Sequence, residues 1–328
     1  MLLSFIVPFY GVEKYIQQCI ESLVAQNISE SEYEIICVND CSPDDSEQIV
    51  KKFANKHSNI HIIKHDVNKK LGAARNTGLR VARGKYVWFV DSDDYIKENC
   101  LEEVIRTCLT NDLEILHFNI CNNKGESIRR LVSTEVISGP KEEIISKQQL
   151  CIEITYPWNR VYKRDFLLNN NLFFNDLYGG DVIHTILAVD KCKRIMNVDE
   201  YYYYYRVDNY NSDTHSPSSP YKLYHMYFVL AQAINEIVPD INLEWRDLVA
   251  ECSPWRINQS RKGILRFNWK ELRTFYKLFH QDKQLYNFAL LFADRKCRFI
   301  LTHQYITMLI SPIYRFVRLI RNKIRSLS

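Results

Sequence analysis

The sequence predicts an α/β protein whose main domain is a doubly wound, mostly parallel sheet flanked by helices, followed by a helical C-terminal extension. Two observations carry this prediction. Strand-like and helix-like patterns alternate through the first 120 residues, and parallel strands need a crossover, usually a helix, between them. In addition, residues 86–90 form an apolar run without polar interruption, which is typical of a strand buried on both faces of a parallel sheet.

The individual helices and strands are predicted from the spacing of apolar residues and from residues that typically end such elements. Apolar residues recur at i, i+3, i+4 and i+7 from Val12 to Val24, which predicts an amphipathic first helix. Gly84 is expected to end the third helix as its C′ residue. The predicted strands cover residues 2–8, 34–38, 60–63, 86–90 and 113–119, and the helices between them cover 12–24, the stretch after the polar turn 39–46, 71–83 and 94–109.

The strand at 86–90 ends in Asp91, Ser92, Asp93 and Asp94. Ligands of doubly wound sheets bind at the carboxyl ends of the strands, and carboxylates crowded there repel one another unless a cation or hydrogen-bond donors compensate them. A hard divalent cation, Mg²⁺ or Mn²⁺, would do so. The competing interpretation is that these residues cap the helix predicted at 94–109, but capping needs only one side-chain oxygen and leaves the other acids unexplained.

Four polar segments are expected to meet at this edge of the sheet: residues 9–13, residues 39–45, the loop through Asn68 with the following Arg75, and residues 91–94. The chain contains neither a Gly-x-Gly-x-x-Gly dinucleotide fingerprint nor a phosphate-binding loop ending in Gly-Lys-Ser/Thr. A nucleotide bound here would have to be held in another way.

Four ordered motifs lie in these segments: Val-Pro-Phe-Tyr-x-x-Glu at 7–13, Val-Asn-Asp-Cys-Ser-Pro-Asp at 38–44, Gly-Ala-Ala-Arg-Asn-Thr-Gly at 72–78, and Gly-Lys-Tyr-Val-Trp-Phe-Val-Asp-Ser-Asp-Asp at 84–94. Together they resemble the family 2 glycosyltransferases of the bacterial surface-polysaccharide type. The resemblance is specific over residues 1–95 and weaker to about residue 215. It implies the GT-A fold, a nucleotide-diphosphate-sugar donor and inversion at the anomeric carbon.

The resemblance also implies roles for single residues. Asp40 would accept a hydrogen bond from a uracil ring nitrogen, and Arg75 would reach toward the base or the phosphates. These roles suit an acceptor-only carboxylate and a guanidinium. Without the other motifs, Asp40 would read as a turn residue and Arg75 as an exposed helix residue. The implied donor-binding residues are Pro8, Tyr10, Glu13, Asp40, Arg75, Asp91 and Ser92, and the implied metal ligands are Asp93 with Asp91 and His215 as further candidates.

The second half of the site carries fewer signals. By resemblance, Asp181 is the general base, at the start of a helical stripe after Gly179-Gly180. Relatives of this type have Glu-Asp here, and Gly180 replaces the Glu, which bears on acceptor binding and on activity. Trp158 is a candidate acceptor wall, although a single Trp is more often a core residue. His215 lies in a polar loop, where a histidine is commonly solvated.

Composition limits the partners. A formal net charge of +4 on 328 residues does not indicate nucleic-acid binding. The ten cysteines include no Cys-x-x-Cys pair and are expected to be buried thiols in a reducing compartment, the cytoplasm. The first apolar run stops at Pro8, which is too short for a signal peptide or a membrane span.

We expect three regions: 1–120 as the nucleotide-sugar-binding half of one domain, 121–220 as its acceptor-binding and catalytic half, and 221–328 as a helical region. Residues 306–328 alternate apolar residues with arginines around Pro312 and contain no acid. This pattern predicts an interfacial helix that binds an anionic membrane, so that the protein is peripherally associated with the inner face of the cell membrane. The alternative is a surface helix packed on the catalytic domain.

The sequence thus predicts a metal-dependent, inverting hexosyltransferase that uses a UDP-sugar and a glycan or lipid-linked acceptor. Two alternatives remain open. A sugar nucleotidyltransferase also combines a doubly wound sheet with nucleotide and Mg²⁺, but it carries a glycine-rich basic loop where this chain has Phe9-Tyr10-Gly11-Val12-Glu13. A catalytically silent sugar-nucleotide-binding subunit would account for Gly180.

Overall fold

The fold is described from a computed structural model of the chain. The structure describes residues 1–129, 135–138, 156–175, 180–209, 264, 268–281, 283, 299–301 and 307. The chain divides into two compact units, Met1–Asp176 with Gly180–His215 and Leu177–Gly179 with Ser216–Ser328. The expected subdivision at residues 120 and 220 stays a prediction.

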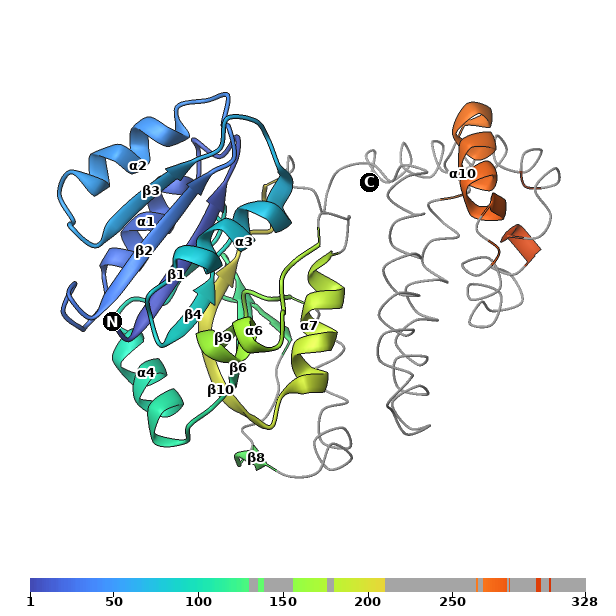
Figure 1. Ribbon diagram of the computed structural model, residues 1–328. Helices are drawn as coiled ribbons and strands as arrows, with labels where there is room; N and C mark the ends of the chain where they lie inside the picture. Colours follow the sequence, from blue (N-terminus) through green and yellow to red (C-terminus); the bar gives the residue numbers. More distant parts are fainter. Residues whose placement is uncertain are drawn as a thin grey trace, which may run out of the picture. The chain divides into compact units, whose positions relative to one another are not determined.

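The first unit is built on one sheet (Figure 1). Its strands are β1 (Leu3–Phe9), β2 (Tyr33–Asn39), β3 (Ile60–Lys64), β4 (Tyr86–Phe89), β5 (Tyr95–Ile96), β6 (Ile115–Asn122), β7 (Ser127–Arg129), β8 (Ile137–Ser138), β9 (Arg160–Lys163) and β10 (Arg194–Tyr205). Their spatial order is β3-β2-β1-β4-β9-β6-β10-β5, with β7 beside β6 and β8 beside β10.

The N-terminal half of this sheet is parallel, as predicted. β1 pairs in parallel with β2 and with β4, and β2 pairs in parallel with β3. Beyond β4 the sheet is mixed, because β9 lies antiparallel between β4 and β6 while β10 is parallel to β6. The carboxyl ends of β1, β2, β3 and β4 therefore share one edge, which also receives the residues that precede β9 and those that follow β10.

Helices cover both faces of the sheet. They are α1 (Ile16–Val24), α2 (Ser46–Ala54), α3 (Lys70–Val81), α4 (Leu101–Thr110), α6 (Arg164–Asn169) and α7 (Gly180–Lys191). Helices α1 and α4 bury their apolar stripes in the core cluster that contains Phe5 and Trp88. Helix α3 covers the opposite face, where a Cβ added to Gly78 would lie 2.4 Å from Cγ2 of Ile6. α3 can approach β1 closely only because residue 78 has no side chain.

Three expectations about helix ends are wrong. The first helix, expected from residue 12, begins at Ile16. The helix predicted from residue 94 begins at Leu101, because residues 95–96 form β5 and pair with Tyr203 and Tyr204 of β10. Helix α3 ends before Ala82, so Gly84 is not its C′ residue. Gly84 instead passes close to β1, where an added Cβ would lie 2.5 Å from the backbone of Leu3 and Ser4.

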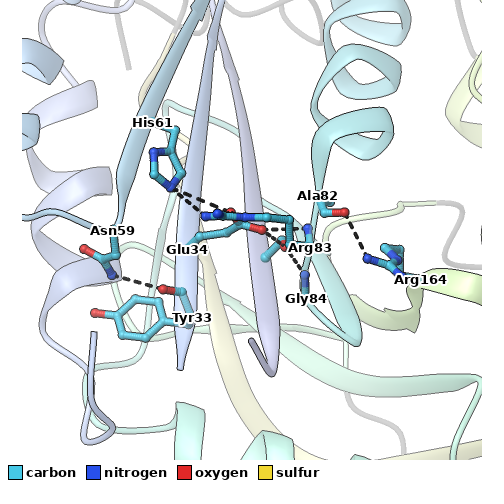
Figure 2. A network of polar contacts seen from close by, with 9 residues as sticks. Tyr33, Glu34, Asn59, His61, Ala82, Arg83, Gly84 and Arg164 are labelled. Carbon is cyan, nitrogen blue, oxygen red and sulfur yellow. Dashed lines mark hydrogen bonds and ion pairs between the residues drawn. The ribbon is translucent and has the colours of Figure 1, made fainter. Parts of the chain in front are cut away.

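A polar network closes the opposite, amino-terminal edge of the sheet (Figure 2). The carboxylate of Glu34, near the start of β2, is buried and accepts hydrogen bonds from the Ser4 hydroxyl (2.6 Å) and from the backbone N of Arg83 (2.7 Å). The Arg83 guanidinium adds a contact at 2.7 Å. Burial alone raises the pKa of Glu34, but the Ser4 and Arg83 hydrogen bonds outweigh it, and the pKa is lowered.

In the second unit the structure describes α10 (Trp269–Gln281) and a few further residues. Leu272, Phe275 and Tyr276 are buried on one side of α10, and the Tyr276 hydroxyl donates to the carbonyl oxygen of Ile300. The tail at 306–328 lies outside the described residues, apart from Thr307. None of the helices in the described part of the chain is long and apolar enough to cross a membrane.

Candidate active site

The loops after β1 and β2 are held together by hydrogen bonds. The backbone N of Gly11 donates to the Ser42 hydroxyl (2.8 Å), and the backbone N of Glu13 donates to the Asp44 carboxylate (2.9 Å). Glu13 returns the contact, because its Oε2 accepts from the backbone N of Asp45 (3.2 Å). Gly11 has a φ of +66°, which glycine adopts without strain. The two loops therefore form one platform at the sheet edge.

The first three residues implied for donor binding, Pro8, Tyr10 and Glu13, differ in exposure. Pro8 is buried in β1 opposite Val38, beyond the last β1 residue that pairs with β4, so its missing N–H breaks no ladder bond on that side. Tyr10 is 50% exposed, and Glu13 is exposed. Of these three, Tyr10 and Glu13 present side-chain surface to a ligand. The Glu13 carboxylate also holds the loop between β2 and α2 in place.

Asp40 is buried at the end of β2 and is held by residues that follow β3. Its Oδ1 lies 2.7 Å from Nδ1 of His65 and accepts a hydrogen bond from the backbone N of Lys69 (2.8 Å). Nε2 of His65 lies 3.0 Å from Oγ1 of Thr77 on α3. His65 is not among the residues predicted from the sequence, although its position directly after a strand at the carboxyl edge of the sheet was a usable signal.

The four residues after β4 have separate environments. Asp94 is buried and accepts hydrogen bonds from the Tyr203 hydroxyl (2.8 Å) and the backbone N of Arg206 (2.7 Å), so it fastens the end of β10 to this loop. Asp93 accepts from Nδ2 of Asn209 (2.7 Å), and Asp91 keeps 23% of its side chain exposed. Ser92 is buried. None of these four caps a helix, since the N-cap of α4 is Cys100.

The electrostatics of this loop fit a divalent cation. Burial first, and the charge of Asp91 second, raise the pKa of Asp93, so the two carboxylates repel each other as they stand. Carboxylate oxygens are the ligands that Mg²⁺ and Mn²⁺ prefer. No group of three or more His, Cys, Asp or Glu side chains in the described ranges could hold a metal alone. A cation here would draw further oxygens from a bound diphosphate, and the third candidate ligand, His215, lies outside the described residues.

Arg75 joins the donor side of the site to the predicted base. Its guanidinium is completely buried, with Nη2 2.6 Å from Oδ1 of Asp91 and Nη1 2.5 Å from Oδ1 of Asp181. It also lies 5.1 Å from the centre of the Phe174 ring. Both Nη groups thus contact carboxylates of the protein, and a donor contact by Arg75 stays a prediction.

Asp181 stands in the first turn of α7 with a third of its side chain exposed. Burial raises its pKa, the Arg75 charge works in the opposite direction, and the Asp91 charge raises it again, so that the pKa lies above its ordinary value. A carboxylate that is partly exposed and more basic than usual is suited to taking a proton from a hydroxyl group.

The structure explains why residue 180 is a glycine. A Cβ at Gly180 would lie 2.3 Å from Oδ1 of Asn175 and 2.7 Å from its carbonyl oxygen. The side chain could move aside, but the carbonyl belongs to the backbone. The position that the resemblance assigns to a Glu is therefore filled by Asn175.

Trp158 is buried, so its ring does not form the predicted acceptor wall. It belongs to an aromatic stack at the same edge of the sheet, 4.4 Å from the ring centre of Tyr203 and 4.7 Å from that of Tyr156. The Tyr203 hydroxyl contacts Asp94, whereas Tyr156 is 44% exposed. Tyr205 also stacks on Trp158, at 5.7 Å, and is partly exposed, so Tyr156 is the most exposed ring of this stack.

Comparison with known proteins identifies the family to which this site belongs. The family model described as glycosyl transferase family 2 matches residues 4–169, about half of the chain. The chain therefore belongs to glycosyl transferase family 2, which confirms the family that the four motifs resemble.

Relatives and solved structures agree with this assignment. Over 228 residues the chain is 35% identical to EpsJ of Bacillus subtilis, named an uncharacterized glycosyltransferase, covering 67% of this chain and 64% of EpsJ. Over 210 residues it is 31% identical to the poly(ribitol-phosphate) beta-glucosyltransferase of Bacillus spizizenii, covering 63% of this chain and 32% of that protein. The chain thus spans less than two thirds of either relative.

The fold matches the crystal structure of Staphylococcus aureus TarS 1–349 in complex with UDP-GlcNAc, with a TM-score of 0.76 and 24% identity over 98% of this chain and 92% of that one. This match confirms the predicted GT-A-type α/β fold.

Proposed function

We propose that this chain is an inverting glycosyltransferase that moves a sugar from a UDP-sugar to a hydroxyl group of a glycan or lipid-linked acceptor. The observation that carries the proposal is the bridge through Arg75, whose buried guanidinium contacts both the Asp91 carboxylate after β4 and the Asp181 carboxylate of α7. Asp91, implied for donor binding, and Asp181, the predicted base, are thus held next to each other, which suits a reaction in which donor and acceptor react in one displacement.

In this displacement Asp181 accepts the proton of the acceptor hydroxyl as its oxygen forms a bond to the anomeric carbon. The bond between that carbon and the diphosphate oxygen breaks, and its electron pair leaves with UDP. One in-line attack inverts the configuration, and no carboxylate nucleophile is needed. His184 is a poor alternative base, because burial and the nearby Arg75 and Arg160 charges lower its pKa to about 3 and its ring stacks on Phe174 at 3.8 Å.

The donor assignment rests on Asp40 and on the relatives. The buried Asp40 carboxylate can accept hydrogen bonds but not donate them, which suits the ring N–H of uracil. The structural neighbour TarS is described in complex with UDP-GlcNAc. Asp93 and Asp91 would hold Mn²⁺ or Mg²⁺, with His215 as a further candidate. When bound there, the metal ion would neutralise the charge that develops on the departing diphosphate.

The B. spizizenii relative is named for poly(ribitol-phosphate), a polymer that carries hydroxyl groups, which is consistent with a hydroxyl acceptor on a polymer. We place the enzyme in the cytoplasm at the inner face of the membrane, with residues 306–328 on anionic lipid. Co-sedimentation with anionic vesicles at low and high salt tests this location, and a full-length protein that ignores such vesicles at low salt would contradict it.

The central test is titration calorimetry of UDP with Mn²⁺, combined with release of UDP from UDP-glucose and UDP-GlcNAc. Wild-type protein should bind UDP and release it slowly from a donor sugar even without an acceptor. Asp93→Asn should lose the metal-dependent part of UDP binding and keep the wild-type melting temperature. Wild-type affinity in Asp93→Asn would remove Asp93 from the metal site.

A second candidate function, a catalytically silent sugar-nucleotide-binding subunit, is favoured by one observation, the glycine at position 180 that the contact with Asn175 requires. Tight UDP binding without any turnover of either donor would support this candidate over the enzyme.

A further inference from the structure

His65 is a buried histidine that no step of the proposed reaction uses. It follows β3 directly, and its backbone N donates to the carbonyl oxygen of Asn39 at the end of β2 (2.9 Å). Only 5% of the residue is exposed. Its ring lies between Asp40 on one side, at 2.7 Å, and Thr77 of α3 on the other, at 3.0 Å.

The partners of the imidazole fix where its proton lies. An ionised carboxylate only accepts hydrogen bonds, so Nδ1 must carry the hydrogen that it donates to Oδ1 of Asp40. Nε2 faces the hydroxyl of Thr77, which is also 3.0 Å from the carbonyl oxygen of Ala73. A ring held at both nitrogens cannot flip without losing two hydrogen bonds.

The same contacts divide the work between the two oxygens of Asp40. Oδ1 receives both His65 and the backbone N of Lys69 (2.8 Å). Among the described residues, none donates a hydrogen bond to Oδ2. Two donors on one oxygen hold the carboxylate in a single rotamer and leave the other oxygen available as an acceptor.

We propose that His65 is a positioning residue that fixes the Asp40 carboxylate with Oδ2 toward the nucleobase and thereby selects uracil over cytosine. This inference rests on the proposed UDP-sugar donor. Uracil presents a ring N–H to such an oxygen, whereas cytosine presents an unprotonated ring nitrogen. If the carboxylate cannot rotate, its Oδ2 and the ring nitrogen of cytosine are two acceptors that face each other without a hydrogen between them. Discrimination between the two bases therefore depends on the carboxylate being held in place.

The test measures the dissociation constants of UDP and CDP, both with Mn²⁺, for the full-length wild-type protein and for variants at position 65. The side-chain amide of His65→Asn can occupy the place of Nδ1, and that of His65→Gln the place of Nε2. Thr77→Val removes only the partner of Nε2, and His65→Leu removes both contacts. The ratio of the two dissociation constants is the readout, because general loosening of the fold would weaken both nucleotides alike.

Wild type should prefer UDP to CDP. His65→Leu should weaken UDP about 10-fold or more, as expected for a lost hydrogen bond to a charged group, and bring the ratio toward one. His65→Asn should keep most of the wild-type preference, Thr77→Val should reduce it only partly, and His65→Gln should lose it. If His65→Leu does not fold, the comparison of Asn with Gln decides.

The outcomes separate the inference from the function on which it rests. A wild-type preference for UDP that persists in His65→Leu, or equal ratios in the Asn and Gln variants, overturns the role of His65 and leaves the UDP-sugar donor intact. A wild-type protein that binds no UDP overturns the proposed donor and this inference with it.

Discussion

The guanidinium of Arg75 and the carboxylate of Asp181 meet at 2.5 Å although the two residues are 106 positions apart in sequence. The Arg75 side chain is completely buried, whereas one third of the Asp181 side chain is exposed. A base held in this way has a fixed orientation and a charged neighbour that opposes its protonation.

Asp181→Asn should leave UDP binding close to wild type and reduce sugar transfer roughly 10²- to 10⁴-fold, because an amide cannot take the acceptor's proton. Calorimetry with UDP and an initial-rate assay separate the two effects. Asp165→Asn is a suitable control, since Asp165 is 64% exposed on α6 and contacts only Arg164 among its described partners. Transfer at the wild-type rate in Asp181→Asn would assign the base to another residue.

Arg75→Met should shift the acidic limb of the kcat–pH profile to higher pH. The reason is that Asp181 works as a base only when it is deprotonated, and its pKa rises further when the neighbouring cation is removed. Arg80→Met is a matched control, because Arg80 also lies on α3 and over a phenylalanine ring, that of Phe173 at 5.0 Å, but is exposed. An Arg75→Met profile that coincides with wild type would show that Arg75 does not influence the base.

Gly180→Glu, which introduces the residue that the family resemblance implies at this position, should destabilise the protein and fail to raise activity. Any Cβ at this position meets the carbonyl oxygen of Asn175 at 2.7 Å. Gly180→Ala tests the Cβ alone, and we expect its melting temperature to fall by a similar amount. A Gly180→Glu protein with the wild-type melting temperature and faster transfer would contradict this account.

Glu34→Gln should lower the free energy of unfolding by about 1–3 kcal/mol at pH 7, the range expected when a buried charge-assisted network loses its anion. Because the pKa of Glu34 is lowered in the folded state, its contribution is present above the unfolded-state pKa of about 4.3 and is lost as pH falls through the lower folded-state value. The difference between wild type and variant should therefore shrink in acid, which urea titrations at pH 7 and at pH 3 would measure.

A control for this prediction is Glu30→Gln, which removes the partner of His57 at a carboxylate that is 41% exposed. It should change stability much less at pH 7. UDP affinity should be unaffected in Glu34→Gln, because Glu34 lies at the amino-terminal edge of the sheet. A pH-independent difference between wild type and Glu34→Gln would contradict the proposed role of the charge.

The sequence predicted the elements that depend on local patterns. Alternating strands and helices placed β1 to β4, and the polar residues after these strands placed Asp40 and Asp91 at one edge, because parallel strands align their carboxyl ends. The start of α4 was misplaced because β5 forms only by pairing with Tyr203 and Tyr204, about 100 residues later, which no local pattern announces.

The rest of the site depends on tertiary contacts. The insertion of β9 between β4 and β6 buries Trp158 and leaves Tyr156 as the exposed end of the stack. The position of His65 after β3 is visible in the sequence, but its contact with Asp40 depends on the pairing of β3 with β2. Arg75 was expected to contact a ligand, and its burial against two carboxylates required the position of α7.

The distance along the chain between Arg75 and Asp181 has a consequence for biosynthesis. At a ribosomal rate of about 5–20 residues per second, the 106 positions that separate them take roughly 5 to 20 s to synthesise. During that interval a nascent N-terminal half that closed around Arg75 would bury a cation with only Asp91 to balance it. We therefore expect α3 and β4 to stay loosely packed on the ribosome until α7 emerges, so that the donor half is completed only once the base can join it.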